Sequence, residues 1–256
     1  MHSERVKLTM TSDGFVARLA LNDPAKRNAM TISMFDAIDH ALGAILASEA
    51  RVVQLYGEGK TFCAGFDLEA ARHDPQLIAR FIERLSLLNR QLRRLPQPVV
   101  AAVHGAAVAG GCAVLSACDF VVVSPDALLG YPVHRIGVSP AVTIPTLMQA
   151  IGPGAARSLL MEGELIDGRE AKRRGLASHL AVDEASLMTE AEALCAMLAA
   201  KPPNAVRVTK QWLNELDGSL HDAMFDQAAI ASASLASTDE AMRMLEEHWA
   251  KRSSRS

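Results

Sequence analysis

The chain lacks the features that would assign it to several large classes of protein. Its four cysteines show neither CxxC spacing nor the neighbouring histidines of a metal site, so we expect reduced thiols and no bound metal. No apolar run approaches the roughly 20 residues that a membrane helix needs, and residues 1–5 lack the apolar core of a signal peptide. The formal net charge of −3 argues against nucleic acid or an anionic membrane surface as the main partner. We therefore expect a cytoplasmic protein with no membrane or nucleic-acid partner.

Aromatic residues are scarce as well, at 4% of the chain, whereas alanine is abundant, a composition that favours closely packed helices. The 256 residues, half of them hydrophobic, are enough to bury a substantial core. Composition therefore indicates one large domain, or a main domain with a small appendage.

The pattern of apolar residues predicts alternating strands and helices in the first part of the chain. Short apolar runs predict strands at 6–10, 15–19, 52–56, 99–103 and 120–123. Apolar residues three and four positions apart predict one helix from Thr31 and another across 78–95, which Pro96 ends. Beyond about residue 180 the pattern is helical only, with helices expected at 184–200, from Pro203 and at 239–252.

This organisation predicts an α/β fold with a core at 1–195 and a helical region at 196–256. The C-terminal helices carry apolar residues over much of their surface. That surface could pack on a neighbouring subunit or on the protein's own domain, and the sequence favours neither.

Two glycine-bearing segments, at 62–68 and 104–112, are the most informative part of the sequence. Each follows a short apolar strand and precedes a helical pattern, so each can present backbone N–H groups at the start of a helix. Two such groups that converge on one point form an oxyanion hole, which stabilises negative charge on a carbonyl oxygen. The pair of segments therefore predicts a site that holds and polarises a carbonyl group.

Four segments, in this order and at this spacing, resemble those of the crotonase superfamily, the enoyl-CoA hydratase/isomerase family. They are LNDPAKRNAM at 21–30, FCAGFDL at 62–68, the glycine-rich stretch at 103–119 and the closing helix at 237–252. Ala109 stands where the family usually has the first of three glycines. The similarity runs nearly from one end of the chain to the other.

The resemblance implies a spiral of stacked ββα units with a C-terminal helical trimerisation region, assembled as a homotrimer or as a hexamer made of two trimers. It also implies a coenzyme A thioester as the substrate, with no covalently bound cofactor. The oxyanion-hole donors that it implies are the backbone N–H groups of Phe66 and Gly110. For Gly105 and Gly111 we favour tight packing of strand against helix over a role in binding.

The resemblance further implies a coenzyme A site made largely of backbone. Its residues are Arg27, Ala29, Ala64, Asp67 and Leu68, with Lys251 at the position of a basic residue that reaches the coenzyme A of a neighbouring subunit. Arg27 could pair with a phosphate or equally be a solvated surface arginine. Asp67 opens a helical stretch, so we expect it to cap that helix rather than to act in catalysis.

The carboxylates expected of a hydratase are missing. Hydratases of the family carry one glutamate three residues after the oxyanion glycine and a second one twenty residues further on, after a proline, and some other members use an aspartate at a third position. In this chain these positions are Ala113, Val133 and Ala141, all of them apolar. Because general acid–base groups contribute about 10²–10⁴ each to the rate, their loss should cripple ordinary hydration.

Tyr131 and His134 are the nearest titratable side chains in the sequence and the candidates for an acid or base. In an extended segment Tyr131 would share a face with Val133 and His134 would point to the other side, which favours a structural role for His134. We therefore expect an acyl-CoA-processing enzyme that stabilises a thioester enolate, with decarboxylase or isomerase-type chemistry in place of standard hydration. The alternative is a non-catalytic, trimeric acyl-CoA-binding scaffold.

Overall fold

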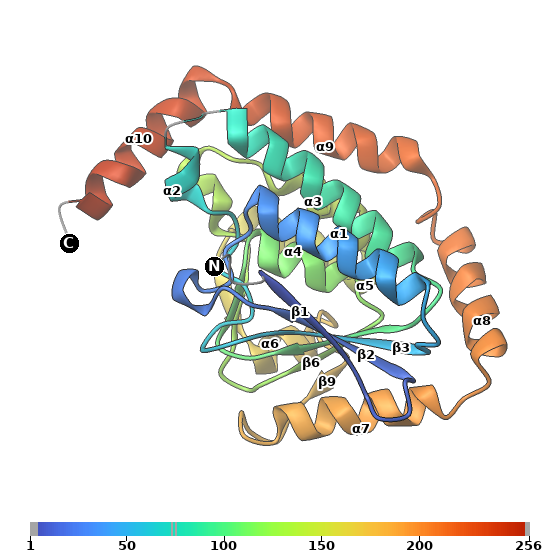
Figure 1. Cartoon of the computed structure of the whole chain (residues 1–256). Helices are drawn as coiled ribbons and strands as arrows, with labels where there is room; N and C mark the ends of the chain where they lie inside the picture. Colours follow the sequence, from blue (N-terminus) through green and yellow to red (C-terminus); the bar gives the residue numbers. More distant parts are fainter. Residues whose placement is uncertain (1–4, 73, 75, 254–256) are drawn as a thin grey trace.

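Two β-sheets covered by helices form the centre of the molecule (Figure 1). The computed structural model describes residues 5–72, 74 and 76–253. For residues 252 and 253 only the backbone is described. The first four residues, on which the expectation about a signal peptide partly rests, lie outside the described residues.

The larger sheet has six strands in the order β1-β2-β3-β4-β6-β9. β1 (Val6–Met10) and β2 (Val16–Leu21) form an antiparallel hairpin, and the remaining strands join in parallel. These are β3 (Val52–Gly57), β4 (Val99–Val103), β6 (Phe120–Val123) and β9 (His179–Leu180). All of β4 is buried, which explains its unbroken apolar sequence, because a parallel strand covered on both faces has no side facing solvent.

The smaller sheet has three short strands that the sequence analysis did not predict. β7 (Leu128–Gly130) lies between β5 (Ala106–Val108), its parallel partner, and β8 (Leu165–Asp167), its antiparallel partner. A bridge between Cys63 and Ala107 attaches the first glycine segment to β5. This sheet therefore brings the two glycine segments together.

Helices cover both faces of the larger sheet (Figure 1). The main core packs beneath α1 (Ile32–Leu46), α3 (Gln76–Arg94), α4 (Gly110–Ala117) and α5 (Ile144–Glu162). A second apolar layer lies between the other face and α7 (Leu187–Ala199). The short elements are α2 (Leu68–Ala71), α6 (Gly168–Arg173) and three 3₁₀ turns, η1 (Pro24–Lys26), η2 (Pro132–Ile136) and η3 (Pro140–Thr143).

Capping residues decide where the predicted helices begin. Thr31 Oγ1 accepts a hydrogen bond from Met34 N at 3.1 Å and starts α1, as the sequence predicts. The helix expected from residue 184 begins later, because Ser186 N donates to Asp183 Oδ1 at 2.8 Å in a turn. This helix, α7, continues through residue 195 to its end at Ala199, so the boundary drawn at 195 falls inside it.

Three further helices, α8 (Pro203–Leu216), α9 (Asp222–Ala236) and α10 (Asp239–Ser253), complete the chain. In Figure 1, α8 stands at the side of the molecule, α9 lies along α3, and α10 leads away towards the C-terminus. Buried Lys210 of α8 binds Asp119 at 2.6 Å, and Ser232 Oγ of α9 accepts from Val142 N at 2.9 Å. Both helices are therefore anchored to their own core.

Part of the apolar surface of α8 stays uncovered. Trp212, Leu213 and Leu216 are 60%, 61% and 80% exposed among the described residues. One side of the C-terminal helices is therefore packed on their own domain, and packing of the exposed side of α8 on a neighbouring subunit stays a prediction.

Candidate functional site

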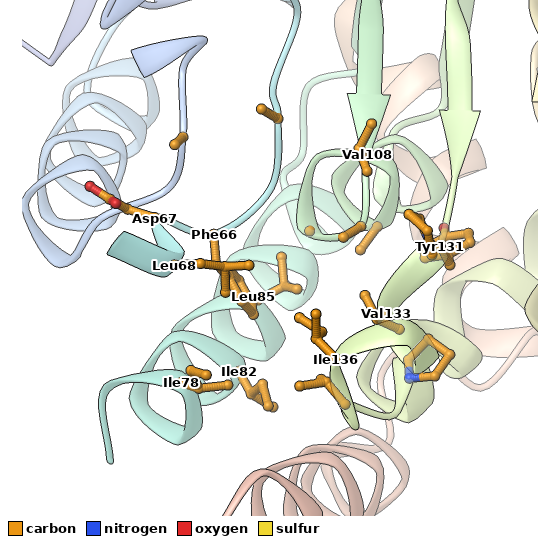
Figure 2. A pocket seen from close by; sticks show the side chains of 18 of the residues that line it. Phe66, Asp67, Leu68, Ile78, Ile82, Leu85, Val108, Tyr131, Val133 and Ile136 are labelled. Carbon is orange, nitrogen blue, oxygen red and sulfur yellow. The ribbon is translucent and has the colours of Figure 1, made fainter. Parts of the chain in front are cut away.

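A cavity of about 590 Å³ opens between α3 and the segment that contains η2 and η3. Figure 2 shows Phe66 and Leu85 facing Val133 and Ile136 across it. The large apolar side chains of its lining belong to Phe66, Leu68, Ile78, Ile82, Leu85, Val108, Val133, Ile136, Val138 and Val142. A largely apolar cavity with few polar groups is typical of a small-molecule binding site.

The two glycine segments meet at one wall of this cavity. Gly65 has a φ of +91°, and a Cβ atom there would lie 2.9 Å from Val108 O and 3.7 Å from Gly110 N. Only glycine fits, because any side chain would collide with the second segment and would be strained at this φ. The sequence prediction that the segments converge is therefore realised by a direct backbone approach.

The backbone N–H groups of Phe66 and Gly110 have no acceptor within the described residues. At the Phe66 bridge, Met30 N donates to Gly65 O at 2.7 Å and Asp67 N donates to Met30 O at 3.0 Å, so the Phe66 amide is left on the opposite side of the strand. Gly110 opens α4, and the first N–H groups of a helix have no acceptor inside it. Phe66 and Gly110 both line the cavity.

The Phe66 ring packs closely over Gly110. A Cβ atom at Gly110 would lie 3.1 Å from Phe66 Cε1 and 3.3 Å from Met30 Sδ. The ring also packs against Phe81 at 5.2 Å between centroids, which fixes its position. The side chain of Phe66 therefore shapes the cavity while its amide stays available.

Ala109, just before Gly110, adopts a backbone conformation that is unfavourable for alanine, with φ 52° and ψ −113°. Such conformations cost about 1–3 kcal/mol and persist where the surroundings impose them. Two hydrogen bonds hold this residue, from Ala109 N to Gly130 O at 2.8 Å and from Ala113 N to Ala109 O at 2.9 Å. The strain therefore sits directly beside the Gly110 amide.

Gly105 and Gly111 are packing positions. A Cβ atom at Gly105 would strike Lys60 O, and one at Gly111 would strike Cys63 O. The structure thus agrees with tight strand–helix packing for Gly111, whereas Gly105 packs against the turn at Lys60 and not against a helix.

The mouth of the cavity is formed by residues of η1 and α2. Asp67 Oδ1 accepts from Ala70 N at 3.1 Å and caps α2, while Oδ2 binds Lys26 Nζ at 2.7 Å. Burial raises the pKa of Asp67, but the Lys26 ammonium and the Ala70 N–H outweigh it and hold this pKa below its usual value. The carboxylate is therefore charged and occupied, in agreement with a capping role.

The other residues assigned to coenzyme A lie in two places. Arg27, Ala29, Ala64 and Leu68 line the cavity with Asp67, and Arg27 is exposed at its mouth. Lys251 lies on α10, exposed and outside the lining. Another α10 residue, His248, lines the mouth, and no sequence signal marks it.

The three positions where the family would have acids carry apolar side chains, and two of them line the cavity. Ala113 and Val133 line the cavity, whereas Ala141 does not. The carboxylates in the described lining are Asp67 and Glu69, both at α2. The apolar part of the cavity therefore has no carboxylate among the residues that line it.

Tyr131 and His134 have different surroundings because the segment is a 3₁₀ turn rather than extended. Tyr131 lines the cavity and is 1% exposed, with its Oη 3.3 Å from Thr143 Oγ1. Burial raises the pKa of Tyr131 well above its ordinary value. His134 is exposed, its ring neighbours Gly163, and it is outside the lining. The structure therefore brings Tyr131, but not His134, to the cavity.

A family model described as enoyl-CoA hydratase/isomerase matches residues 11–252. The chain belongs to this family, in the crotonase superfamily. The match covers both glycine segments, the cavity and the C-terminal helices, so the resemblance seen in the sequence is confirmed.

Enoyl-CoA hydratase/isomerase relatives agree on fold and differ in reaction. A Thermus thermophilus protein, provisionally named an enoyl-CoA hydratase, is 39% identical over 231 residues, which are 88% of this chain and 91% of the relative. The mitochondrial Delta(3,5)-Delta(2,4)-dienoyl-CoA isomerase of Dictyostelium discoideum is 28% identical over 255 residues, 92% and 85% of the two chains. A crystal structure of an enoyl-CoA hydratase from Mycobacterium avium has a TM-score of 0.85 at 28% identity and covers 97% of each chain.

These similarities confirm the crotonase-like α/β fold and an acyl-CoA enzyme of the hydratase/isomerase family. They leave the reaction open within that family, because the relatives carry both hydratase and isomerase names. The described residues contain no group of three His, Cys, Asp or Glu side chains that could hold a metal ion. Across the same part of the chain, no helix is long and apolar enough to cross a membrane.

Proposed function

We propose that the protein binds an acyl-CoA thioester with the carbonyl oxygen between the N–H groups of Phe66 and Gly110, and stabilises the enolate that forms there. The observation that carries the proposal is the pair of amides without acceptors at the wall of an apolar cavity. In a site that excludes water, hydrogen-bond donors aimed at a developing oxyanion are not screened by solvent, and each stabilises the transition state by about 3–4 kcal/mol. The positive end of α4 adds to this at Gly110.

The cavity's two chemical zones suit the two parts of such a substrate. Exposed Lys26 and Arg27 at the mouth suit the phosphates of coenzyme A, and the backbone of Ala29, Ala64 and Leu68 lies beside them. The apolar interior suits an acyl chain, whose burial contributes about 0.8 kcal/mol per CH₂ group. We propose a homotrimer or a hexamer, in which Lys251 reaches the coenzyme A of a neighbouring subunit and the exposed side of α8 is covered.

Decarboxylation is the reaction that these residues support best. A carboxylate on C2 would lie against Ala113 and Val133, in apolar surroundings that disfavour its charge. Loss of CO₂ breaks the bond between C2 and the carboxyl group and leaves the electron pair in the enolate, so no base is needed. The two amides stabilise the enolate oxygen, and water then supplies a proton to C2. Isomerase-type chemistry ranks second, because it needs a residue that moves a proton.

The competing function is a non-catalytic acyl-CoA-binding scaffold. The apolar residues at the three acid positions favour it, since a binder needs no acid. The strained backbone at Ala109 opposes it, because strain maintained beside the Gly110 amide is typical of a site selected for chemistry.

Turnover of a thioester panel tests the proposal. We expect malonyl-CoA or methylmalonyl-CoA to release CO₂ and the corresponding acyl-CoA, and crotonyl-CoA not to be hydrated. Tight binding without turnover across the panel would favour the scaffold. Efficient hydration of crotonyl-CoA that is lost in Gly110→Pro but retained in Tyr131→Phe and His134→Ala would overturn our account of the missing acids.

A further inference from the structure

Four hydroxyl side chains from different elements cluster beside the cavity. They belong to Ser116 of α4, Tyr131, Thr143 at the end of η3 and Thr146 of α5, and all are at most 1% exposed. Ser116 lies one turn of α4 beyond Ala113, about 4.5 Å further from Gly110 along the helix. The cluster therefore adjoins the part of the cavity beyond the missing-acid position.

The hydrogen bonds of this cluster are unequal. Ser116 Oγ lies 2.6 Å from Thr146 Oγ1 and donates to Ala113 O at 2.7 Å, which are ordinary O–H···O lengths. Thr143 Oγ1 is 3.3 Å from Tyr131 Oη and 3.5 Å from Ser116 Oγ, both long for such a bond. Tyr131 also neighbours the Cys112 thiol, a weak partner, and the Ser116 hydroxyl, whose own proton is donated to Ala113 O.

The two hydroxyls with long contacts are the two whose residues line the cavity. Tyr131 and Thr143 belong to the lining, whereas Ser116 and Thr146 lie behind them. Short hydrogen bonds thus satisfy the Ser116 and Thr146 hydroxyls. The Tyr131 and Thr143 hydroxyls have only long contacts, so each can form a further hydrogen bond. A buried hydroxyl without a good partner costs free energy, so a ligand atom that completes the set would be favoured.

Proton transfer is a poor use of this cluster. Burial raises the pKa of Tyr131 well above its ordinary value, because a phenolate would be left in apolar surroundings. An anionic ligand is disfavoured too, since the cationic residues of the described lining, Lys26, Arg27 and Arg135, are all exposed at the surface. Neutral hydrogen bonding is the chemistry that remains.

We propose that the Tyr131 and Thr143 hydroxyls form a polar subsite for a neutral oxygen, a keto or hydroxyl group, that the acyl chain carries beyond C3. This inference rests on the proposed binding of an acyl-CoA thioester in the cavity. With the thioester oxygen at Gly110, C2 and C3 lie beside Ala113, and the next turn of α4 brings the chain to the hydroxyls. The protein then selects acyl groups by a feature distant from the reacting carbons.

Calorimetric titration with three saturated thioesters tests the subsite. The probes are hexanoyl-CoA, 4-oxohexanoyl-CoA and 5-oxohexanoyl-CoA. They differ only in whether the acyl chain carries a keto oxygen and at which carbon. We expect at least one oxo compound to bind about tenfold more tightly than hexanoyl-CoA. In Thr143→Val and in Tyr131→Phe the ratio should fall towards one, because each variant leaves the keto oxygen with only one of the two hydroxyl donors.

Matched controls separate the subsite from general effects of losing a hydroxyl. Tyr56→Phe on β3 and Thr209→Val on α8 remove the same groups outside the cavity lining and should keep the wild-type ratio. Equal affinity for all three probes in the wild type would overturn the subsite, and this result needs no variant to fold. An unchanged ratio in both Thr143→Val and Tyr131→Phe would overturn it too. If none of the probes binds, the proposed function itself fails; if they bind without preference, only the subsite fails.

Discussion

The cavity has two walls that the chain builds in different ways. The backbone wall presents the amides of Phe66 and Gly110 beside the Phe66 ring, and left-handed Gly65 and the start of α4 position these amides. The opposite wall, η2 and η3, presents side chains such as Val133 and Thr143. Substitutions can change the second wall without moving the amides of the first. In the function that we propose, holding the thioester carbonyl and choosing its reaction would therefore be separable tasks.

The largest expected effect comes from removing one amide of the backbone wall. Gly110→Pro eliminates an N–H, and we expect kcat on the best thioester of the panel to fall about 10²–10³-fold. Proline is tolerated in the first turn of a helix, so α4 should persist. Steady-state kinetics measure the effect, and circular dichroism checks the fold.

Gly110→Ala is the control for this variant, since it keeps the amide and adds only a methyl group against the Phe66 ring. It should lose much less activity than Gly110→Pro. Equal losses in the two variants would show that shape, and not the N–H group, matters at this position.

The next effect should come from adding acids on both sides of the site, at Ala113 on α4 of the backbone wall and at Val133 on η2 of the side-chain wall. In the double variant Ala113→Glu/Val133→Glu, we expect crotonyl-CoA hydration to rise at least about 10²-fold over the wild type, because each acid–base group contributes about 10²–10⁴. The double glutamine variant supplies similar bulk without the carboxylates. If the glutamate and glutamine variants hydrate crotonyl-CoA equally, or if neither does, carboxylates at these positions do not choose the reaction. Holding the carbonyl and choosing the reaction are then not separable tasks.

A smaller effect concerns the mouth, where Lys26 and Asp67 join η1 to α2. The ion pair between exposed Lys26 and buried Asp67 contributes on the order of 1 kcal/mol, and the cap about 1 kcal/mol. Asp67→Asn keeps a capping oxygen and should cost less unfolding free energy than Asp67→Ala, which removes both interactions. Urea denaturation of the two variants measures the difference.

The pH dependence of that stability has a defined sign. The pKa of folded Asp67 is lowered from 3.8, so its charged form stabilises the fold above the pKa of the unfolded chain. The stability advantage over Asp67→Asn should shrink as the pH falls through the lowered pKa of the folded state. If the difference in unfolding free energy between the wild type and Asp67→Asn stayed constant from neutral pH to pH 3, the result would contradict a stabilising ion pair.

The backbone wall could be predicted from sequence far better than the side-chain wall. Gly65 and Gly110 lie in contiguous motifs whose local conformation follows from glycine and from the start of a helix. The strands of the smaller sheet are only three residues long and carry too little periodicity to be recognised. Around Tyr131, an extended segment was expected, whereas Pro132 begins a 3₁₀ turn that ends at left-handed Gly137.

The part of the cavity lining that α3 contributes, and the hydroxyl cluster, had no local signal. Ile78, Ile82 and Leu85 repeat with helical spacing, and this pattern is the same whether a helix faces a core or a cavity. Ser116 and Thr143 come together only through the packing of α4 against η3 and α5. Contacts between distant segments depend on the tertiary fold, so single-sequence patterns do not reveal them.

The smallest expected effect tests whether the backbone wall stores strain. Ala109→Gly should raise the unfolding free energy by about 1 kcal/mol, because it relieves about 1–3 kcal/mol of strain and gives back about 0.4–1 kcal/mol of chain entropy. Ala107→Gly, two residues earlier in β5, is the matched control and should destabilise instead, since that fully buried alanine packs normally. Opposite signs in urea denaturation would locate the strain at the residue that orients the Gly110 amide. Destabilisation by both variants would mean that Ala109 is relaxed, and the backbone wall would then need no strain to hold its amide in place.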